Sequence, residues 1–225
     1  MEPRPAGLAF FDADETLITV KSMFDFYDFF LDAVGHTPQE QERLHQEARD
    51  LLRPGLPRAQ GNRLFYRRFA GYRAAEVARV GRAWFDRRLA RGGFFHEDVL
   101  AALRAHRAAG RTTVVLSGSF PAPLDPVVAY AGADVLVSTR LEVRDGVYTG
   151  EVLRTMIGDA KAETARKLIA DAGAAAADCH AYGDHGSDLG LLSLVGHPVV
   201  VGANPELTAA ADANGWRRLA GVAAA

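Results

Sequence analysis

Short, continuously apolar runs recur along the chain, and each one stops at a polar residue or a glycine. Strands of a parallel sheet are buried on both faces, so this pattern predicts a parallel sheet. Segments with apolar residues at helical spacing separate the runs, and 97–107 and 160–171 are the clearest. The alternation predicts an α/β fold with a doubly wound, mostly parallel Rossmann-like sheet. The predicted strands are residues 6–11, 112–116, 134–137, 179–182 and 198–201.

Residues 18–92 contain no strand-like run and are predicted to be helical. Apolar residues in 23–34 follow helical spacing, and 37–40 combine an N-cap threonine, a proline and a capping-box acid. Further on, Asp145-Gly146 lies between two short β-prone runs and predicts a β-hairpin. We therefore expect a core domain formed by 1–17 and 93–225, an inserted helical cap domain formed by 18–92, and a small β-hairpin.

The composition of the 225-residue chain excludes several classes of protein. A formal net charge of -2 gives no chain-wide sign of nucleic-acid binding, and the single cysteine, Cys179, excludes an internal disulfide. No stretch approaches the roughly 20 apolar residues that span a bilayer. Residues 1–5 lack the charged and apolar blocks of a signal peptide. We expect a cytoplasmic monomer or homodimer that binds no nucleic acid.

Two aspartates, Asp12 and Asp14, directly follow the first predicted strand. Two like charges about 4 Å apart repel by roughly 4 kcal/mol at an effective dielectric near 20. A divalent cation, a shared proton or a nearby lysine would compensate, and all three serve phosphoryl transfer. Aspartates in this place can also be simple turn or cap residues, so the interpretation depends on what the other strand ends contribute.

Three further segments carry candidate partners for these aspartates. Ser117-Gly118 ends the second strand with a hydroxyl and an amide that suit a phosphate oxygen. Lys161 opens a helix in a chain with only three lysines. Residues 182–188 contain two more acids, whose oxygens suit hard cations. Because ligands bind at the carboxyl ends of the strands in such sheets, we expect these groups to meet at one edge.

Taken in order, the motifs DxDxT, apolar run then Ser, Lys, and GDxxxD resemble those of the haloacid dehalogenase (HAD) superfamily of phosphohydrolases, over about residues 6–215. Residues 139–143, 145–150 and 204–207 look like subfamily IB, which contains the phosphoserine phosphatases and has its helical cap between the first two motifs. The resemblance implies a HAD-like core, Mg²⁺ as cofactor, and a phosphatase that works through an aspartyl phosphate.

The resemblance also implies a role for each acidic residue of the motifs. Asp12 would be the nucleophile and a magnesium ligand. Asp14 would protonate the leaving oxygen and later deprotonate the attacking water, and its backbone carbonyl would touch the metal. Asp184 would complete the metal shell. Asp188 would support it, through a water or as a partner of the motif lysine.

Four other residues would bind or orient the phosphoryl group. Ser117 and the amide of Gly118 would bind its oxygens, and Lys161 would neutralise charge between the phosphate and the nucleophile. Thr16 would orient the first loop.

Lys21 departs from the family pattern. Phosphoserine phosphatases have a glutamate nine residues after the nucleophile, which binds the substrate ammonium, and Lys21 stands at the matching position. A lysine cannot accept that hydrogen bond and would repel the ammonium. An anionic or neutral leaving group therefore fits better than phosphoserine, unless Lys21 simply points to solvent.

Residues 43–91 hold 13 arginines against four acidic residues, a formal charge of +9. A positive cap could steer a phosphorylated metabolite toward the cleft, or contact anionic lipid or nucleic acid. The alternation with Leu, Phe and Trp is also what an ordinary solvated helix face gives, and we favour that interpretation.

The expected function is hydrolysis of a small phosphorylated metabolite, with lipid phosphates still among the candidates. One alternative is a phosphotransferase in which an alcohol rather than water attacks the aspartyl phosphate. Another is a signalling module that accepts phosphate on an aspartate without turnover. Asp14 and the helical insert argue against the signalling module, since a phosphoacceptor alone needs neither.

Overall fold

The computed structural model describes residues 7–52 and 55–221. Its main sheet has six strands in the order β3-β2-β1-β6-β7-β8, and each pairing between neighbours is parallel. The strands are β1 (Leu8–Phe11), β2 (Thr112–Ser117), β3 (Val135–Ser138), β6 (His180–Gly183), β7 (His197–Val201) and β8 (Arg217–Leu219). The predicted parallel sheet is confirmed, and β8 extends it by one strand that no apolar run indicated.

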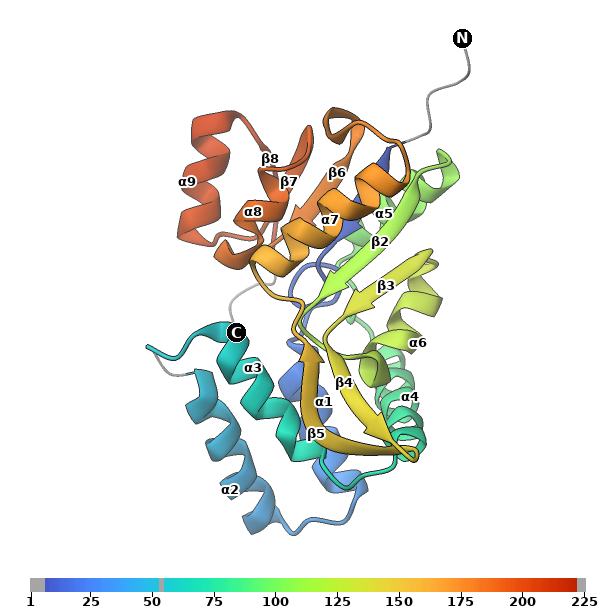
Figure 1. Ribbon diagram of the computed structural model, residues 1–225, viewed down its shortest axis with the longest axis vertical. Helices are drawn as coiled ribbons and strands as arrows, with labels where there is room; N and C mark the ends of the chain where they lie inside the picture. The colour runs from blue at the N-terminus through green and yellow to red at the C-terminus, as the bar shows by residue number, and fades with distance from the viewer. Residues whose placement is uncertain (1–6, 53–54, 222–225) are drawn as a thin grey trace.

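Helices cover both faces of this sheet (Figure 1). Leu8 and Phe10 point to one face, where they join a core cluster with α7 (Asp159–Asp171), while Phe11 points to the other and joins a cluster with α5 (Glu97–Ala108). Successive side chains of a strand alternate in this way, and each fully buried Phe or Leu stabilises the fold by roughly 1.5–3 kcal/mol. These helices are α5 (Glu97–Ala108), α6 (Pro121–Ala131), α7 (Asp159–Asp171), α8 (Leu189–Leu192) and α9 (Pro205–Asn214).

The insert between β1 and α5 is helical, as predicted. It contains α1 (Ser22–Ala33), α2 (Pro38–Arg49), α3 (Arg58–Tyr66) and α4 (Ala74–Arg91), with short 3-10 segments at Asp50–Leu52 and Arg67–Phe69. The predicted capping box starts α2, because the Glu40 amide donates to Thr37 Oγ1 and the Thr37 amide donates to the Glu40 carboxylate. Aromatic rings of α1 fill the space between these helices, with Phe26 against both Phe69 and Trp84.

The predicted hairpin is formed by β4 (Arg140–Arg144) and β5 (Val147–Arg154). Asp145 and Gly146 both have positive φ angles, of 50° and 77°, as a tight two-residue hairpin turn requires. The hairpin lies along the helical insert rather than in the main sheet (Figure 1). The Tyr148 amide donates to the Tyr72 carbonyl at 3.0 Å, and the Gly71 amide donates back to Tyr148 at 2.9 Å. The domain boundaries, which place the hairpin in the core, stay a prediction.

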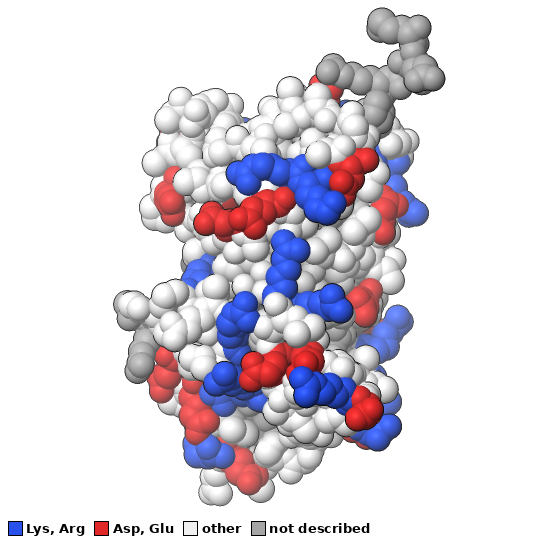
Figure 2. Space-filling model, viewed as in Figure 1, with Lys and Arg blue, Asp and Glu red and all other residues white. Residues whose placement is uncertain are grey.

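Blue and red side chains alternate over the lower half of the face that Figure 2 shows, where the insert and the hairpin lie. This pattern is what an ordinary solvated surface gives, and it does not form a single positive patch on that face. Ion pairs join Arg43 and Arg68 to Glu47, Arg49 to Glu42, Arg82 to Asp86, and Arg88 to Asp25.

Residues 1–5, on which the expected cytoplasmic location depends, lie outside the described residues. Within 7–52 and 55–221, no helix is both long enough and apolar enough to cross a membrane. The location of the protein stays a prediction.

Three histidine rings pack against one another near the amino ends of β6 and β7, at the edge of the sheet opposite the strand ends that carry the motifs. The ring of His180 lies 4.3 Å from that of His106 and 4.4 Å from that of His197. Burial and these two neighbours lower the pKa of His180 from 6.5 to about 4. The folded protein therefore holds His180 neutral over a range in which the unfolded chain binds a proton.

We expect the free energy of unfolding to fall as pH drops from about 6.5 toward 4, because protons then favour the unfolded chain. His180→Phe keeps a stacked ring but cannot titrate, so its stability should fall less over this range. Urea midpoints of both proteins at pH 7.5 and pH 5 measure the difference. Equal losses in the two proteins would contradict this account.

Candidate active site

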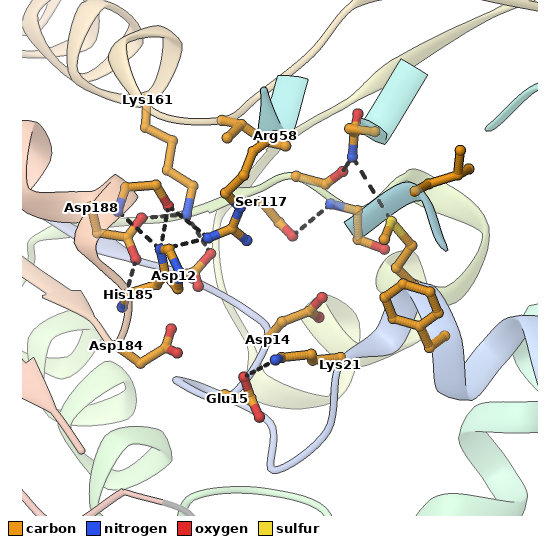
Figure 3. Close-up of a pocket in the computed structure, with 18 of the residues that line it drawn as sticks. Asp12, Asp14, Glu15, Lys21, Arg58, Ser117, Lys161, Asp184, His185 and Asp188 are labelled. Carbon is orange, nitrogen blue, oxygen red and sulfur yellow. Dashed lines mark hydrogen bonds and ion pairs between the residues drawn. The ribbon is translucent and has the colours of Figure 1, made fainter. Parts of the chain in front are cut away.

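Three strand ends that carry motif residues meet at one edge of the sheet. Asp12 follows β1, Ser117 ends β2 and Asp184 follows β6. Because β1 lies between β2 and β6 and all three run parallel, their carboxyl ends are adjacent. A cavity of about 270 Å³ lies there, between the sheet and the helical insert (Figure 3). The predicted site residues that line it are Asp12, Asp14, Lys21, Ser117, Gly118, Lys161, Asp184 and Asp188.

Lys161 forms the charged centre of the site. Its Nζ lies 2.5 Å from Asp12 Oδ1 and 2.7 Å from Asp188 Oδ1, and all three side chains are at least nine-tenths buried. Burial opposes the charged ammonium, but the two carboxylates outweigh it and raise the pKa of Lys161 above its ordinary value. The first turn of α7 thus places a permanent positive charge against Asp12.

Asp12, Asp184 and Asp188 form a cluster in which each offers an oxygen within 4.8 Å of the others. Burial raises the pKa of Asp12, although Lys161 opposes the shift. Burial together with the charges of Asp12 and Asp188 raises the pKa of Asp184 to about 8. One ammonium does not balance three carboxylates, so the cluster favours an additional cation. Its all-oxygen donor set fits a hard divalent ion.

The tight approach of these acids depends on Gly183 at the end of β6. A Cβ atom at this position would lie 2.8 Å from Asp188 Cβ, closer than such atoms pack. Glycine therefore lets the strand end and the following loop meet. Any larger residue would push Asp188 away from Lys161.

Asp14 and Thr16 complete the first loop. Asp14 Oδ1 is buried and has no hydrogen-bond partner among the residues that the structure describes. Burial and the charge of Asp12 raise the pKa of Asp14 to about 7. Thr16 does not line the cavity, but its Oγ1 donates to Asp184 Oδ1 at 2.9 Å and so ties the first loop to the last one.

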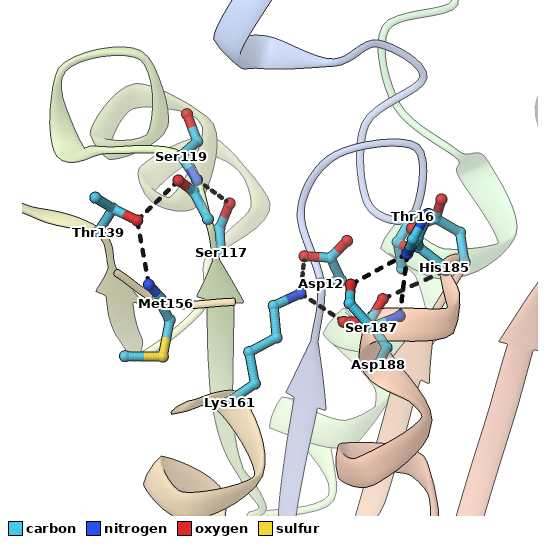
Figure 4. Close-up of polar contacts among 12 residues, drawn as sticks. Asp12, Thr16, Ser117, Ser119, Thr139, Met156, Lys161, His185, Ser187 and Asp188 are labelled. Atoms are coloured by element: carbon cyan, nitrogen blue, oxygen red, sulfur yellow. Dashed lines mark hydrogen bonds and ion pairs between the residues drawn. The ribbon is translucent and has the colours of Figure 1, made fainter. Parts of the chain in front are cut away.

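The turn after β2 offers donors to the cavity. Ser117 is buried, and its Oγ accepts a hydrogen bond from the Ser119 amide at 3.0 Å (Figure 4). A Cβ atom on Gly118 would lie 2.8 Å from Ile157 Cγ1, so only glycine fits there without moving that side chain. The sequence prediction placed both Ser117 and Gly118 here, and both line the cavity.

Charged groups from the insert line the other part of the cavity. Lys21 Nζ forms an ion pair with Glu15 at 3.2 Å (Figure 3). Arg58 Nη1 donates to His185 Nδ1 at 2.5 Å, and no carboxylate within 7–52 or 55–221 pairs with Arg58. Burial and this guanidinium lower the pKa of His185. Sequence reasoning missed Arg58, because one arginine among 23 carries no signal of its own.

Comparisons with known proteins agree with this geometry. The chain matches the haloacid dehalogenase-like hydrolase family over residues 9–193. A probable phosphatase of Mycobacterium tuberculosis is 32% identical over 218 residues, which cover 95% of this chain and 75% of that protein. A solved protein of unknown function from Bordetella pertussis has a TM-score of 0.83 at 26% identity, covering 94% of this chain and 97% of that one. A phospho-aspartyl intermediate analogue of phosphoserine phosphatase has a TM-score of 0.67 at 20% identity, covering 92% and 91%, which shows a shared fold.

The matched residues include all of the motifs that first indicated this family, from Asp12 to Asp188. The relatives also include phosphoserine phosphatases, in agreement with the resemblance to subfamily IB. The chain therefore belongs to the haloacid dehalogenase-like hydrolases and is a phosphatase of that family.

Proposed function

We propose that this phosphatase hydrolyses small phosphomonoesters in the presence of Mg²⁺ and forms an aspartyl phosphate on Asp12. The observation that carries the proposal is the buried contact of Lys161 with Asp12 and Asp188, beside a third carboxylate at the floor of a cavity. Lys161 opposes the rise that burial causes in the pKa of Asp12 and so favours the ionised carboxylate, which is the form that attacks phosphorus. The phospho-aspartyl analogue with the same fold is consistent with this chemistry.

In the first proposed step, an oxygen of Asp12 bonds to phosphorus while the bond from phosphorus to the leaving oxygen breaks. Asp14 gives its proton to that oxygen, so the product leaves as a neutral alcohol. In the second step Asp14 takes a proton from water, the water oxygen bonds to phosphorus, and the bond to Asp12 breaks. Asp14 Oδ1 is buried and has no hydrogen-bond partner within 7–52 or 55–221, which suits both proton transfers.

The phosphoryl oxygens would be held by Ser117 Oγ and the Gly118 amide, with Lys161 offsetting negative charge as the bond to Asp12 forms. Asp12, Asp184, the backbone carbonyl of Asp14 and, directly or through water, Asp188 would hold Mg²⁺. When bound, that ion would neutralise charge on the transferring group.

The leaving group would lie against Lys21 and Arg58. Arg58 has no carboxylate partner in the described ranges, whereas Glu15 already pairs with Lys21. This end of the cavity therefore has a surplus of positive charge and disfavours a substrate ammonium. A screen of phosphorylated sugars, amino acids, nucleotides, polyols and lipid head groups with Mg²⁺ tests the proposed function. If the protein hydrolysed none of these compounds, the proposed function would be contradicted.

A matched substrate pair tests the role of Lys21. Phosphoserine and 3-phosphooxypropionate have the same phosphate and carboxylate but differ in the ammonium, which Lys21 should repel. We expect kcat/KM to favour the substrate without the ammonium. Lys21→Glu should shift the ratio toward phosphoserine by about tenfold, equivalent to ~1.4 kcal/mol, and Lys21→Gln by less. A ratio that stays constant across the three proteins would mean that Lys21 only faces solvent.

A further inference from the structure

The carbonyl oxygen of Gly118 accepts hydrogen bonds from three side chains. Asn62 Nδ2 donates at 2.8 Å, Thr139 Oγ1 at 2.8 Å and the Tyr66 hydroxyl at 3.1 Å. The three donors are 4%, 0% and 1% exposed, so each would be unsatisfied without a protein partner. One donor would satisfy a buried carbonyl, and three exceed its two lone pairs. The three hydrogen bonds therefore hold this oxygen in place more firmly than is needed to satisfy a buried carbonyl.

Thr139 also fixes the preceding peptide. Its amide lies within hydrogen-bond distance of the Ser117 carbonyl, at 3.2 Å, and of the Ser119 carbonyl, at 2.8 Å. The C=O of Ser117 and the N–H of Gly118 belong to one planar trans peptide and point in opposite directions. Holding the carbonyl therefore aims the Gly118 amide. Thr139 is itself anchored, because its Oγ1 accepts from the Met156 amide at 3.2 Å (Figure 4).

The helical insert supplies several of these contacts. Asn62 and Tyr66 lie four residues apart on α3 and so share a face of that helix. Ser22, the first residue of α1, donates to Ser119 Oγ at 2.7 Å, and both residues are buried. Two helices of the insert thus bond directly to the turn that would bind phosphate.

We infer that Asn62, Tyr66 and Thr139 are positioning residues that hold the Ser117-Gly118-Ser119 turn in the orientation that binds the transferred phosphoryl group. Their side chains fix the Gly118-Ser119 peptide, whose amide donates to Ser117 Oγ, and the Thr139 backbone amide fixes the Ser117-Gly118 peptide. The inference rests on the proposed function of that turn. It makes α3 a structural part of the phosphate site as well as a cover over the leaving group.

Conservative variants test the inference. Thr139→Val and Tyr66→Phe each remove one hydroxyl and keep most of the side-chain volume, and the ring left by Tyr66→Phe would retain the packing against Phe69 and Phe120. We expect each variant to lower kcat/KM about 3- to 10-fold, and the double variant about 10- to 100-fold. The factor should be the same for p-nitrophenyl phosphate and 3-phosphooxypropionate, since the turn contacts only the phosphoryl group. Thr139→Ser should restore most of the loss.

The affinity for inorganic phosphate, measured by calorimetry with Mg²⁺ present, gives a readout that needs no turnover. Its Kd should rise by a similar factor in both variants. Thr113→Val and Tyr182→Phe are matched controls, because they remove buried hydroxyls bonded to Asp134 and His106, outside the cavity lining. The controls should lose thermal stability but keep the parent Kd for phosphate.

The results separate failure of this inference from failure of the proposed function. An active parent with variants whose kcat/KM and phosphate Kd stay within twofold of the parent would overturn the positioning role alone. A parent that hydrolyses no phosphomonoester, but whose phosphate affinity falls in the variants, would refute the proposed function and support the positioning role.

Discussion

Asp12→Asn is expected to lower kcat for p-nitrophenyl phosphate by at least about 10³-fold while the protein stays folded. The amide has nearly the same shape as the carboxylate, but it is a poor nucleophile and carries no charge. Lys161 keeps a buried partner in Asp188, at 2.7 Å, so the substitution does not strand the ammonium. Steady-state kinetics measure the loss of activity. Circular dichroism and the thermal midpoint show whether the variant stays folded. Activity above about one per cent of the parent would count against Asp12 as nucleophile.

Loss of activity alone does not distinguish a nucleophile from a metal ligand, so the intermediate must also be trapped. Borohydride reduction of an aspartyl phosphate during turnover should convert Asp12 to homoserine, which peptide mass spectrometry identifies. The homoserine label should be absent from Asp12→Asn, which cannot form the aspartyl phosphate at this position. Asp171→Asn is a matched control, since it neutralises an aspartate that pairs with a lysine on the same helix as Lys161, but on the surface. It should retain both activity and label.

The position of the acids could be predicted from the sequence because it follows from topology. An apolar run predicts a buried parallel strand, and the residue after it must lie at the carboxyl edge of the sheet. Asp12 and Asp184 follow β1 and β6, which pair directly, so their proximity needed no side-chain detail. The contact of Lys161 with both Asp12 and Asp188 was expected from the family resemblance rather than from spacing.

Helix α3 was predicted only as part of the helical insert and not as a separate helix, although it contributes most to the new inference. Its buried residues are Gly61, Asn62, Phe65 and Tyr66, so half of its inward face is small or polar. Phe65 packs in the apolar core, but Asn62 and Tyr66 donate to a polar turn, so the apolar positions alone are too few for hydrophobic periodicity to indicate this helix. The role of Thr139 was not predicted either, because it depends on contacts with the turn after β2, which is distant in sequence.

The sixth strand escaped prediction for a related reason. β8 has the sequence Arg-Arg-Leu and lies at the end of the sheet, where it pairs only with β7 among the described strands. An edge strand is formed by backbone hydrogen bonds and needs no apolar run. Hydrophobic patterns therefore miss an edge strand that has no apolar run, such as β8, but they identify one that has such a run, such as β3 at the other edge.

Removal of divalent cations is expected to abolish turnover, and Mg²⁺ should restore it. Three carboxylates lie within 4.8 Å of one another against a single ammonium, so charge repulsion acts on the cluster until a cation binds. Binding to the folded state alone should also raise the thermal midpoint. At a Mg²⁺ concentration of 100 times Kd, the folded state gains about 2.7 kcal/mol. Activity and melting curves in EDTA, and then with added Mg²⁺, measure both effects.

Asp184→Asn separates metal binding from general stability, because Asp184 belongs to the cluster but does not contact Lys161 within ion-pair distance in the described structure. Without metal, the variant should be about as stable as the parent, since burial and the neighbouring carboxylates raise the pKa of Asp184 to about 8 and already keep it largely neutral near pH 7. With Mg²⁺ its midpoint should hardly rise, and its activity should stay about 10²-fold or more below that of the parent. Asp171→Asn should show the full Mg²⁺-dependent rise. A rise as large in Asp184→Asn as in the parent would place the cation elsewhere.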